Sequence, residues 1–232
     1  MKFLEPLPGR PRGNTLPSEA AVLEHFVRRD PWCRYRKPRY QIEMMLDLAA
    51  LLPVGSCRII DIGAGSGLIG EAIASLLPGK SVAGVDVAGR AMPDLSIPFA
   101  RFDGCRLPFR DRSFDCALFC NVLHHVKPEG RIGLLREALR VTGGGPIVIK
   151  DHLAGRPLDG FRLWLLDFLG NAPRGAMVAA DYLGAREWEE LLRALDCAGA
   201  ILPVARYRRS LWSWCLPNRL EICFTVRANA SL

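Results

Sequence analysis

Residues 58–70 read RIIDIGAGSGLIG, a short apolar run followed by Asp61 and by glycines at 63, 65, 67 and 70. Glycine lets a backbone come close to a ligand and adopt positive φ angles. Gly65, Gly67 and Gly70 also satisfy the G-x-G-x-x-G pattern of dinucleotide-binding loops, which is weak evidence when taken alone. The segment therefore predicts a ligand-binding loop and leaves the ligand class open.

The charge of Asp61 narrows the ligand class. A carboxylate directly before the loop would face a pyrophosphate with like charge, and no Gly-Lys-Ser/Thr follows as in a P-loop. S-adenosylmethionine fits better, because it carries an ammonium, a sulfonium and a ribose with two hydroxyls. Asp86 follows the next apolar run, where a carboxylate can accept both ribose hydroxyls. The helix start after Gly67 would favour the carboxylate of the ligand.

Four motifs follow one another along the chain: DIGAGSG, GVD, RFDGCRLPF and FDCALFCNVLHHV. Together they resemble class I S-adenosylmethionine-dependent methyltransferases of the small-molecule type, over roughly residues 35–152. The resemblance implies that Asp103 and Gly104 lie beside the adenine and that Asn121 lies close to the methionine moiety and the methyl group. The expected cofactor-binding residues are Asp61, Gly63, Ala64, Gly65, Gly67, Asp86, Val87, Asp103, Gly104 and Asn121.

Alternating apolar segments predict an α/β fold. Near-continuous apolar strands separated by helices are typical of a parallel sheet that is covered on both faces. The resemblance implies a Rossmann-like open sheet with strand order 3-2-1-4-5-7-6, mostly parallel with an antiparallel terminal strand. We expect strands at 58–62, 81–87, 97–102, 115–120, 146–151, 200–209 and 218–227, and helices at 68–77, 128–141 and 185–199.

The remaining segments suggest how the chain is organised. Residues 1–52 read as an N-terminal arm and a helical lid, with one helix capped by Ser18 and another from about residue 38. Residues 53–232 read as the methyltransferase domain, with a helical cap insertion at about 153–184. Glycine and prolines between residues 87 and 98 exclude a long helix there.

Methyl transfer from a sulfonium is an in-line displacement that depends mainly on alignment, and it needs a base only if the acceptor must lose a proton. His124, His125 and His152, with Asp151, follow two expected strands at the edge where open α/β sheets bind ligands. His152 is the first choice, because polar residues directly after a buried strand have no evident core role. A structural role for each imidazole is the alternative. No metal is expected.

The sequence says less about the methyl acceptor than about the cofactor. Trp164 and Phe168 in the expected insertion, with Tyr40 in the lid, are candidates for an apolar substrate pocket. They favour a small, largely apolar metabolite of aromatic or acyl type, methylated on oxygen or carbon; an acceptor presented on a carrier protein is a further option. The absence of Asn-Pro-Pro-Tyr/Phe after the fourth strand argues against methylation of an exocyclic base nitrogen. An RNA methyltransferase and a non-catalytic S-adenosylmethionine-binding protein stay open as alternatives.

Charge and cysteine usage bear on partners and location. The formal net charge is +7, and basic residues alternate with aromatic ones in 28–39 and 206–214. Such segments suit an acidic carrier protein or an anionic surface, or else form a solvated face. The eight cysteines form no CxxC pair, which argues against zinc and disulfides. With no apolar run long enough to span a membrane, we expect a cytoplasmic protein without nucleic acid.

Overall fold

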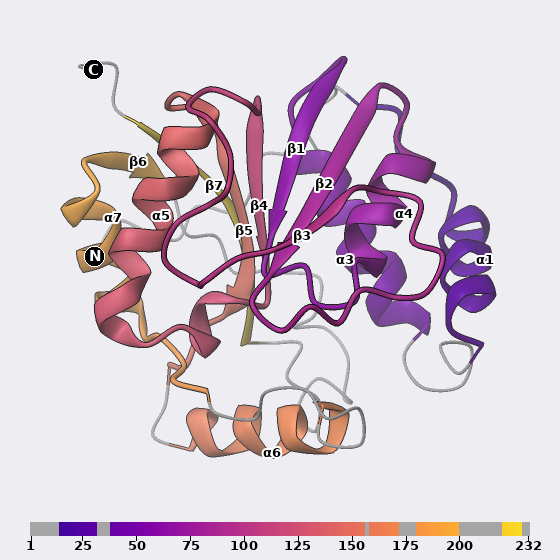
Figure 1. Ribbon diagram of the computed structural model, residues 1–232. Helices are drawn as coiled ribbons and strands as arrows, with labels where there is room; N and C mark the ends of the chain where they lie inside the picture. The colour runs from indigo at the N-terminus through magenta and orange to yellow at the C-terminus, as the bar shows by residue number, and fades with distance from the viewer. Residues whose placement is uncertain (1–13, 32–37, 156–157, 172–179, 200–219, 229–232) are drawn as a thin grey trace.

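The computed structural model describes residues 14–31, 38–155, 158–171, 180–199 and 220–228. Within them the chain forms one seven-stranded sheet in the order β3-β2-β1-β4-β5-β7-β6 (Figure 1). Neighbouring strands are parallel from β3 to β5, whereas β7 runs antiparallel to β5 and to β6. The strands are β1 Cys57–Ile62, β2 Lys80–Asp86, β3 Phe99–Arg101, β4 Cys116–Cys120, β5 Ile147–His152, β6 Cys197–Gly199 and β7 Glu221–Ala228.

Helices cover both faces of this sheet. Figure 1 shows α1, α3 and α4 on one side and α5 and α7 on the other, while α6 lies below the sheet, at the end where β5 leads into it. The helices are α1 Glu19–Arg29, α3 Pro38–Leu51, α4 Leu68–Leu76, the 3-10 helix η1 Leu123–His125, α5 Pro128–Thr142, α6 Asp159–Asn171 and α7 Ala185–Ala194.

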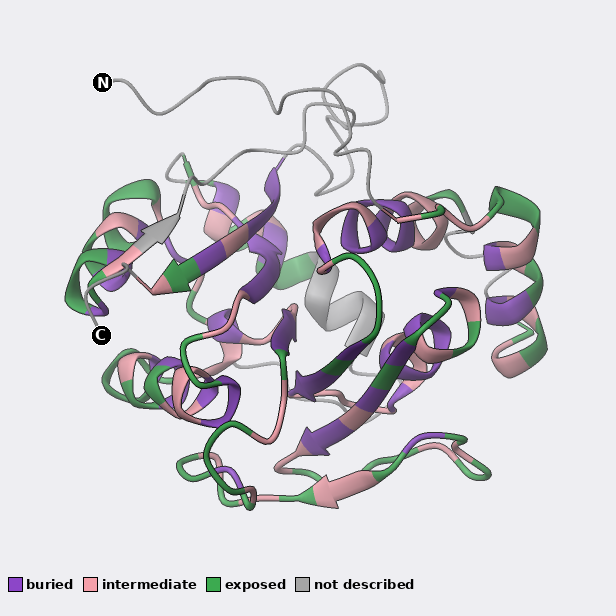
Figure 2. Ribbon diagram, turned by 90° about the horizontal axis from the view of Figure 1, so that it is seen from above, coloured by how far each residue is buried: buried purple, intermediate pink, exposed green. Residues whose placement is uncertain are grey.

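The core lies in two layers, one on each face of the sheet. The first layer joins α1, α3 and α4 to the strands through side chains such as Phe26, Met45 and Ile73. The second joins α5 and α7 through side chains such as Leu135 and Trp188. Figure 2 shows this burial as buried residues along the central strands and exposed residues on the outer sides of the helices. The division of the chain at residue 52 stays a prediction.

Local sequence explains where several elements begin and end. Ser18 caps α1, because its side-chain oxygen accepts a hydrogen bond from the N–H of Ala21 at 3.1 Å. α5 ends at Gly143, whose φ of 61° lies in the left-handed region that glycine adopts without strain. All six residues of β5 are buried, although its last three are Lys150, Asp151 and His152.

The structure confirms the expected strand order, the antiparallel terminal strand and a helix inserted after β5. The helix expected over 185–199 is wrong at its end. α7 stops at Ala194, Asp196 has a left-handed φ of 49°, and Cys197–Gly199 pairs with β7 as a strand. The strand expected at 200–209 lies outside the described residues.

The region between β2 and β3 contains no helix, as its glycine and prolines predict. In the described part of the chain, no helix has the length and apolar character needed to cross a membrane. The expected cytoplasmic location stays a prediction.

Candidate active site

The loop between β1 and α4 has the close contacts that its glycines predict. Gly63, Gly65 and Gly67 have φ angles of 74°, 57° and 82°. A Cβ atom on Gly63 would lie 2.6 Å from Val122 Cγ1, and one on Gly67 would lie 2.5 Å from Leu95 Cδ2. The positive φ angles therefore favour glycine at both positions, and at Gly63 the close approach of Val122 leaves no space for a Cβ atom unless Val122 shifts.

Asp86, at the end of β2, holds this loop directly. One carboxylate oxygen accepts a hydrogen bond from the N–H of Gly65 at 2.9 Å, and the other accepts one from Ala88 at 2.7 Å. The N–H of Ala64 donates to the carbonyl of Val85 at 2.9 Å, which ties the loop to the same strand. The structure thus brings together the loop and the carboxylate that the sequence predicts for the ribose.

Asp61 lies beneath the loop and is 1% exposed. Burial, and next the charge of Asp86, raise the pKa of Asp61 to about 7, while the nearby backbone N–H of Gly70 lowers it. This N–H does not make a well-aligned hydrogen bond to Oδ2 of Asp61, and that oxygen has no other hydrogen-bond partner in the structure as described. A buried carboxylate oxygen of this kind suits a cationic ligand group.

The expected adenine residues form a turn after β3. Asp103 is exposed, and its Oδ1 accepts hydrogen bonds from the N–H groups of Cys105 at 2.8 Å and Arg106 at 2.7 Å. The bonds from Arg106 and Cys105 lower the pKa of Asp103. Gly104 has a φ of 83°, and a Cβ atom there would lie 3.2 Å from Val87 Cγ1. Val87 and Gly104 are therefore neighbours, as two residues expected to bind the same cofactor should be.

Asn121, directly after β4, has a left-handed φ of 58°. Its N–H donates to the carbonyl of Lys150 at 2.7 Å, and its Oδ1 accepts from Lys150 Nζ at 2.8 Å. Its Nδ2 lies 3.4 Å from the hydroxyl of Tyr40 in α3. The structure thus joins Tyr40, expected to contact the substrate, to Asn121, expected to contact the cofactor.

A buried ionic cluster surrounds the end of β5. Lys150 Nζ pairs with Glu221 Oε2, and His152 Nε2 lies 3.1 Å from Glu221 Oε1. On the other side, His124 Nδ1 lies 2.5 Å from Asp151 Oδ1. The rings of His124 and His152 are 5.1 Å apart, and His125 lies 4.1 Å from His124. All three expected catalytic histidines therefore meet at this edge of the sheet.

The charges in this cluster shift each other's pKa values. Burial alone would lower the pKa of His152, but Glu221 and Asp151 raise it. Burial alone would raise the pKa of Glu221, but His152 and Lys150 lower it to about 2. Burial alone would likewise raise the pKa of Asp151, but His124 and His152 lower it. The expectation that Asp151 and His152 have no role in the core is therefore wrong, because both are buried and take part in this cluster.

His124, Asp151 and His152 offer ligand atoms within 4.8 Å of one another, a distance compatible with a shared metal ion. The carboxylate of Asp151, however, is already bound. It accepts hydrogen bonds from the backbone N–H groups of Leu123 at 3.0 Å and His152 at 2.8 Å, besides its contact with His124. These bonds account for the grouping without a metal, so it does not identify a metal centre.

Residues before α7 complete the surroundings of His124. Tyr182 stacks on the His124 ring at 5.0 Å, and the N–H of Asp181 donates to the His124 carbonyl at 2.7 Å. Arg131, which is buried in α5, donates to the carbonyls of Leu123 and Asp181. This framework fixes η1 and with it the orientation of His124.

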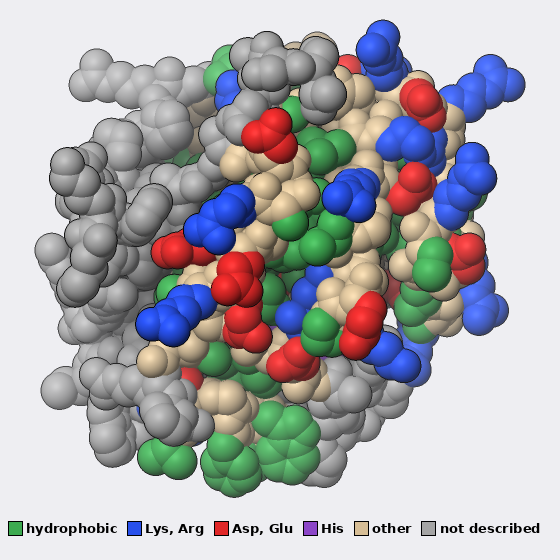
Figure 3. Space-filling view, turned by 90° about the vertical axis from the view of Figure 1, so that its left-hand side faces the viewer, with side chains coloured by type: hydrophobic (Ala, Val, Ile, Leu, Met, Phe, Trp, Pro, Cys, Tyr) green, Lys and Arg blue, Asp and Glu red, His purple; other side chains and the backbone are tan. Residues whose placement is uncertain are grey.

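Three apolar residues of α6, Phe161, Trp164 and Leu165, are exposed, whereas Leu163 is buried. Trp164 is 39% exposed and stacks on Phe161, which is 61% exposed, with ring centroids 6.0 Å apart. Figure 3 shows apolar side chains gathered at the lower edge of the molecule, the level at which α6 lies in Figure 1. The side chain of Phe168 lies outside the described residues, so the substrate-pocket assignment of Trp164 and Phe168 stays a prediction.

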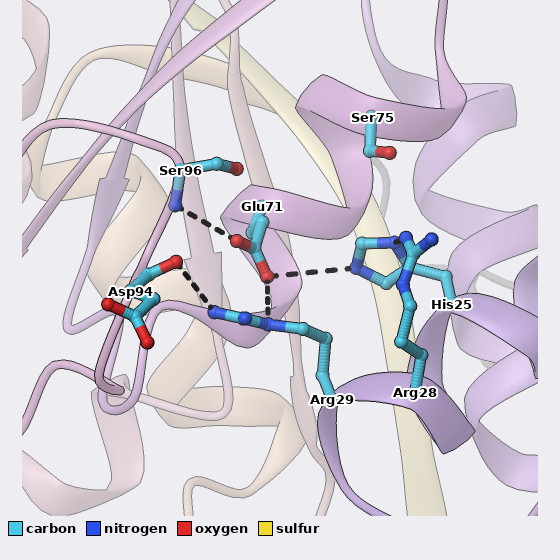
Figure 4. A pocket seen from close by; sticks show the side chains of 7 residues that line it. All are labelled: His25, Arg28, Arg29, Glu71, Ser75, Asp94 and Ser96. Atoms are coloured by element: carbon cyan, nitrogen blue, oxygen red, sulfur yellow. Dashed lines mark hydrogen bonds and ion pairs between the residues drawn. The ribbon is translucent and has the colours of Figure 1, made fainter.

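Glu71 in α4 fastens α1 of the lid to α4 and to the segment between β2 and β3 (Figure 4). Its carboxylate lies 2.7 Å from Arg29 Nε and accepts from the N–H of Ser96 at 2.9 Å. Arg29 also donates to the carbonyls of Pro93 and Asp94. These groups surround a hollow of about 240 Å³. Arg29 therefore supports the fold, and because residues 32–37 and 206–214 lie outside the described chain, an anionic partner for these segments stays a prediction.

Comparison with known proteins identifies the family. Residues 60–149 match the family described as a methyltransferase domain. The chain is 30% identical over 185 residues to an uncharacterized methyltransferase of Mycobacterium tuberculosis, covering 72% of this chain and 71% of the relative. It belongs to the class I S-adenosylmethionine-dependent methyltransferases. This methyltransferase is also 28% identical over 212 residues to a ubiquinone biosynthesis O-methyltransferase of Cereibacter sphaeroides, covering 81% of this chain and 79% of that one.

Solved structures agree on the fold of the methyltransferase. A crystal structure of a Pyrococcus horikoshii protein superposes with a TM-score of 0.60 at 16% identity, covering 88% of this chain and 98% of that chain. S-adenosylmethionine is the cofactor of the family. The residues present fit it, because the buried Asp61 oxygen can take an ammonium and the position of a Cβ atom on Gly65 faces open space, which leaves room for a ligand beside the loop.

Lys150 and Glu221 are the main site residues that sequence reasoning missed. Lys150 carries a signal, since a lysine inside the apolar strand 146–151 needs a buried partner. The partner itself cannot be read from the sequence, because Glu221 lies 71 residues after Lys150 in the chain, and only the β5–β7 register places it opposite His152. Tyr182 and Arg131 had no signal in the local pattern.

Proposed function

We propose that the methyltransferase holds S-adenosylmethionine across the glycine loop and methylates a small, largely apolar acceptor at the edge formed by β4 and β5. The observation that carries this proposal is the buried oxygen of Asp61, which lacks a well-aligned hydrogen bond and lies directly beneath the loop that Asp86 fastens. When bound, the cofactor supplies a methyl group on a sulfonium, which is open to in-line displacement by a nucleophile.

Each cofactor-binding residue has a proposed part. Asp61 pairs with the ammonium, and Asp86 accepts from the ribose hydroxyls after releasing or sharing the N–H groups of Gly65 and Ala88. The turn at Asp103, together with the touching pair Val87 and Gly104, borders the adenine. Asn121 binds the methionine end, and the backbone of Gly63, Ala64, Gly65 and Gly67 covers the ligand.

The acceptor is proposed to be aromatic or acyl in type. Support comes from the exposed apolar face of α6, where Phe161, Trp164 and Leu165 follow β5 in the chain. It also comes from the name of one relative, a ubiquinone biosynthesis O-methyltransferase. Methylation on oxygen is the first proposal and methylation on carbon the second. A carrier-bound acceptor and a cytoplasmic location remain part of the proposal.

A general base is proposed among His124, His125 and His152. Asp151 accepts from Nδ1 of His124 in the neutral tautomer, which puts the basic lone pair on Nε2. A carboxylate that orients an imidazole in this way is a recurrent arrangement for a base. His152 has a raised pKa because Glu221 and Asp151 favour its charged form, and its Nε2 is already occupied by Glu221 Oε1 at 3.1 Å. This favours His124 over His152 as the base.

Label transfer from methyl-tritiated S-adenosylmethionine tests the function. The wild-type protein is incubated with extracts divided into organic-soluble metabolites, acyl-carrier fractions and RNA. Incorporation into the organic-soluble pool, lost in Asp86→Ala, is expected. Incorporation into RNA alone would establish the alternative of an RNA methyltransferase. Cofactor binding with no incorporation into any pool would favour a non-catalytic binding protein.

Single alanine variants of the three histidines test the base. We expect His124→Ala to lower turnover by about a hundredfold to ten-thousandfold, the usual share of a general base, with little change in cofactor affinity. A larger loss in His152→Ala than in His124→Ala would reverse the assignment. Near-full turnover in all three variants would mean that catalysis depends on alignment alone.

A further inference from the structure

Lys150 is a charged residue in β5, a strand whose six residues are all buried. It is 3% exposed. Burial alone would lower its pKa, but Glu221 raises it well above the usual value, so the side chain is an ammonium. The ammonium makes three contacts, with Glu221 Oε2, the Tyr40 hydroxyl and Asn121 Oδ1.

Two of these three contacts belong to the candidate active site. Lys150 holds Asn121 at two points, because its carbonyl accepts from the Asn121 N–H at 2.7 Å and its ammonium donates to Asn121 Oδ1 at 2.8 Å. A residue with a left-handed φ of 58° needs such support from its surroundings. The same ammonium anchors Tyr40, and with it the start of α3, against the ends of β4 and β5.

Stability alone gives little reason for this ion pair. Taking Lys150 and Glu221 out of water costs free energy that their attraction only partly returns, and apolar residues of similar volume often serve a fold equally well. The positions opposite and beside Lys150 in β7 and β4 are Cys223 and Cys120, so an apolar residue would suit the strand. The contacts with Asn121 and Tyr40 are what an apolar residue could not supply.

We propose that Lys150 is a positioning residue for methyl transfer, which fixes Asn121 and Tyr40 side by side at the methionine end of the cofactor. The inference rests on the proposed place of that end beside Asn121. Glu221 neutralises the ammonium and leaves it free to donate to the two neutral side chains. Lys150 itself touches neither cofactor nor acceptor.

The test uses calorimetric binding of S-adenosylhomocysteine together with the melting temperature of the full chain. This product has a neutral sulfur, so loss of the Lys150 charge does not by itself favour binding, as it would for the sulfonium. Lys150→Met should lower the melting temperature and weaken binding by about tenfold, which corresponds to the loss of one or two hydrogen bonds. Lys150→Met with Glu221→Gln removes the carboxylate that has lost its lysine partner, at the expense of its ion pair with His152, so the melting temperature should recover in part while binding stays about tenfold weaker.

Lys80 provides a matched control. It is also buried, at 6% exposed, and its ammonium donates to the carbonyls of Pro53 and Gly55 at the opposite end of the sheet. Lys80→Met should lower the melting temperature and leave S-adenosylhomocysteine binding within about twofold of the wild type. A difference between the two lysines in binding, but not in stability, is what positioning predicts and a purely structural role does not.

The outcomes separate this inference from the proposed function. Wild-type affinity in the double variant, or equal weakening in Lys80→Met, would overturn the role of Lys150. If Asp86→Ala also binds like the wild type, the proposed cofactor site is itself wrong. If Asp86→Ala weakens binding and the Lys150 variants do not, only the inference about Lys150 fails.

Discussion

Cofactor affinity should depend on pH through Asp61. Its pKa of about 7 in the free protein means that this buried carboxyl is about half protonated near neutral pH. An ammonium beside it would favour the ionised form, so binding at low pH must release a proton. The affinity for S-adenosylmethionine should therefore rise with pH until Asp61 is ionised and then level off.

The size of the effect follows from the pKa. If only the ionised form binds well, the competent fraction rises from about one tenth near pH 6 to about three quarters near pH 7.5, a gain of about eightfold. Isothermal titration calorimetry in buffers of different ionisation enthalpy measures both the affinity and the number of protons released. The upper limit near pH 7.5 keeps the amino group of the ligand mostly charged.

Asp61→Asn is the control, because the amide keeps the shape and cannot titrate. This variant should bind more weakly, with an affinity that is flat between about pH 6 and pH 7.5. The free wild-type protein should also lose stability relative to Asp61→Asn over this range. A carboxyl with a raised folded pKa is proton-rich in the folded state, so its contribution falls as pH rises toward that pKa. A flat wild-type affinity, or equal pH slopes in both proteins, would refute the pairing of Asp61 with an ammonium.

Three further substitutions test the surroundings of the loop. Asp86→Ala should weaken S-adenosylmethionine binding by about 1–3 kcal/mol, whereas Asp115→Ala, at the other end of the sheet, removes a similar backbone hydrogen bond at 2.8 Å and should leave calorimetric binding unchanged. Gly67→Ala should cost about 1–2 kcal/mol of stability in denaturant unfolding, because its φ of 82° is strained for alanine; an unchanged midpoint would contradict this. Glu71→Gln should loosen the lid and speed hydrogen exchange in α1, and unchanged exchange there would show that the contact with Arg29 does not hold it.

The glycine loop and Asp86 were predictable because their chemistry is local. A glycine between a strand and a helix needs a close approach or a positive φ, and Gly63 and Gly67 show both. A carboxylate at the end of the next parallel strand must lie at the same edge of the sheet, and Asp86 does. The strand order came from the family resemblance, since the alternation of elements alone leaves several orders open.

The charged cluster at β5 was not predictable, because it depends on pairing across the sheet. Nothing near Lys150 or His152 in the chain indicates Glu221, which the antiparallel register of β7 brings opposite His152. The end of α7 was mispredicted for a related reason. The pattern of 185–199 favours a helix, but the left-handed Asp196 ends it and the free edge of β7 takes Cys197–Gly199 as a strand.

A crystal structure of the protein with S-adenosylhomocysteine tests the central assignment most directly. The account predicts the ammonium within hydrogen-bond distance of Asp61, both ribose hydroxyls on Asp86, and the sulfur directed toward Asn121 and Tyr40. A ligand whose sulfur points away from Asn121, or whose ribose makes no contact with Asp86, would contradict it.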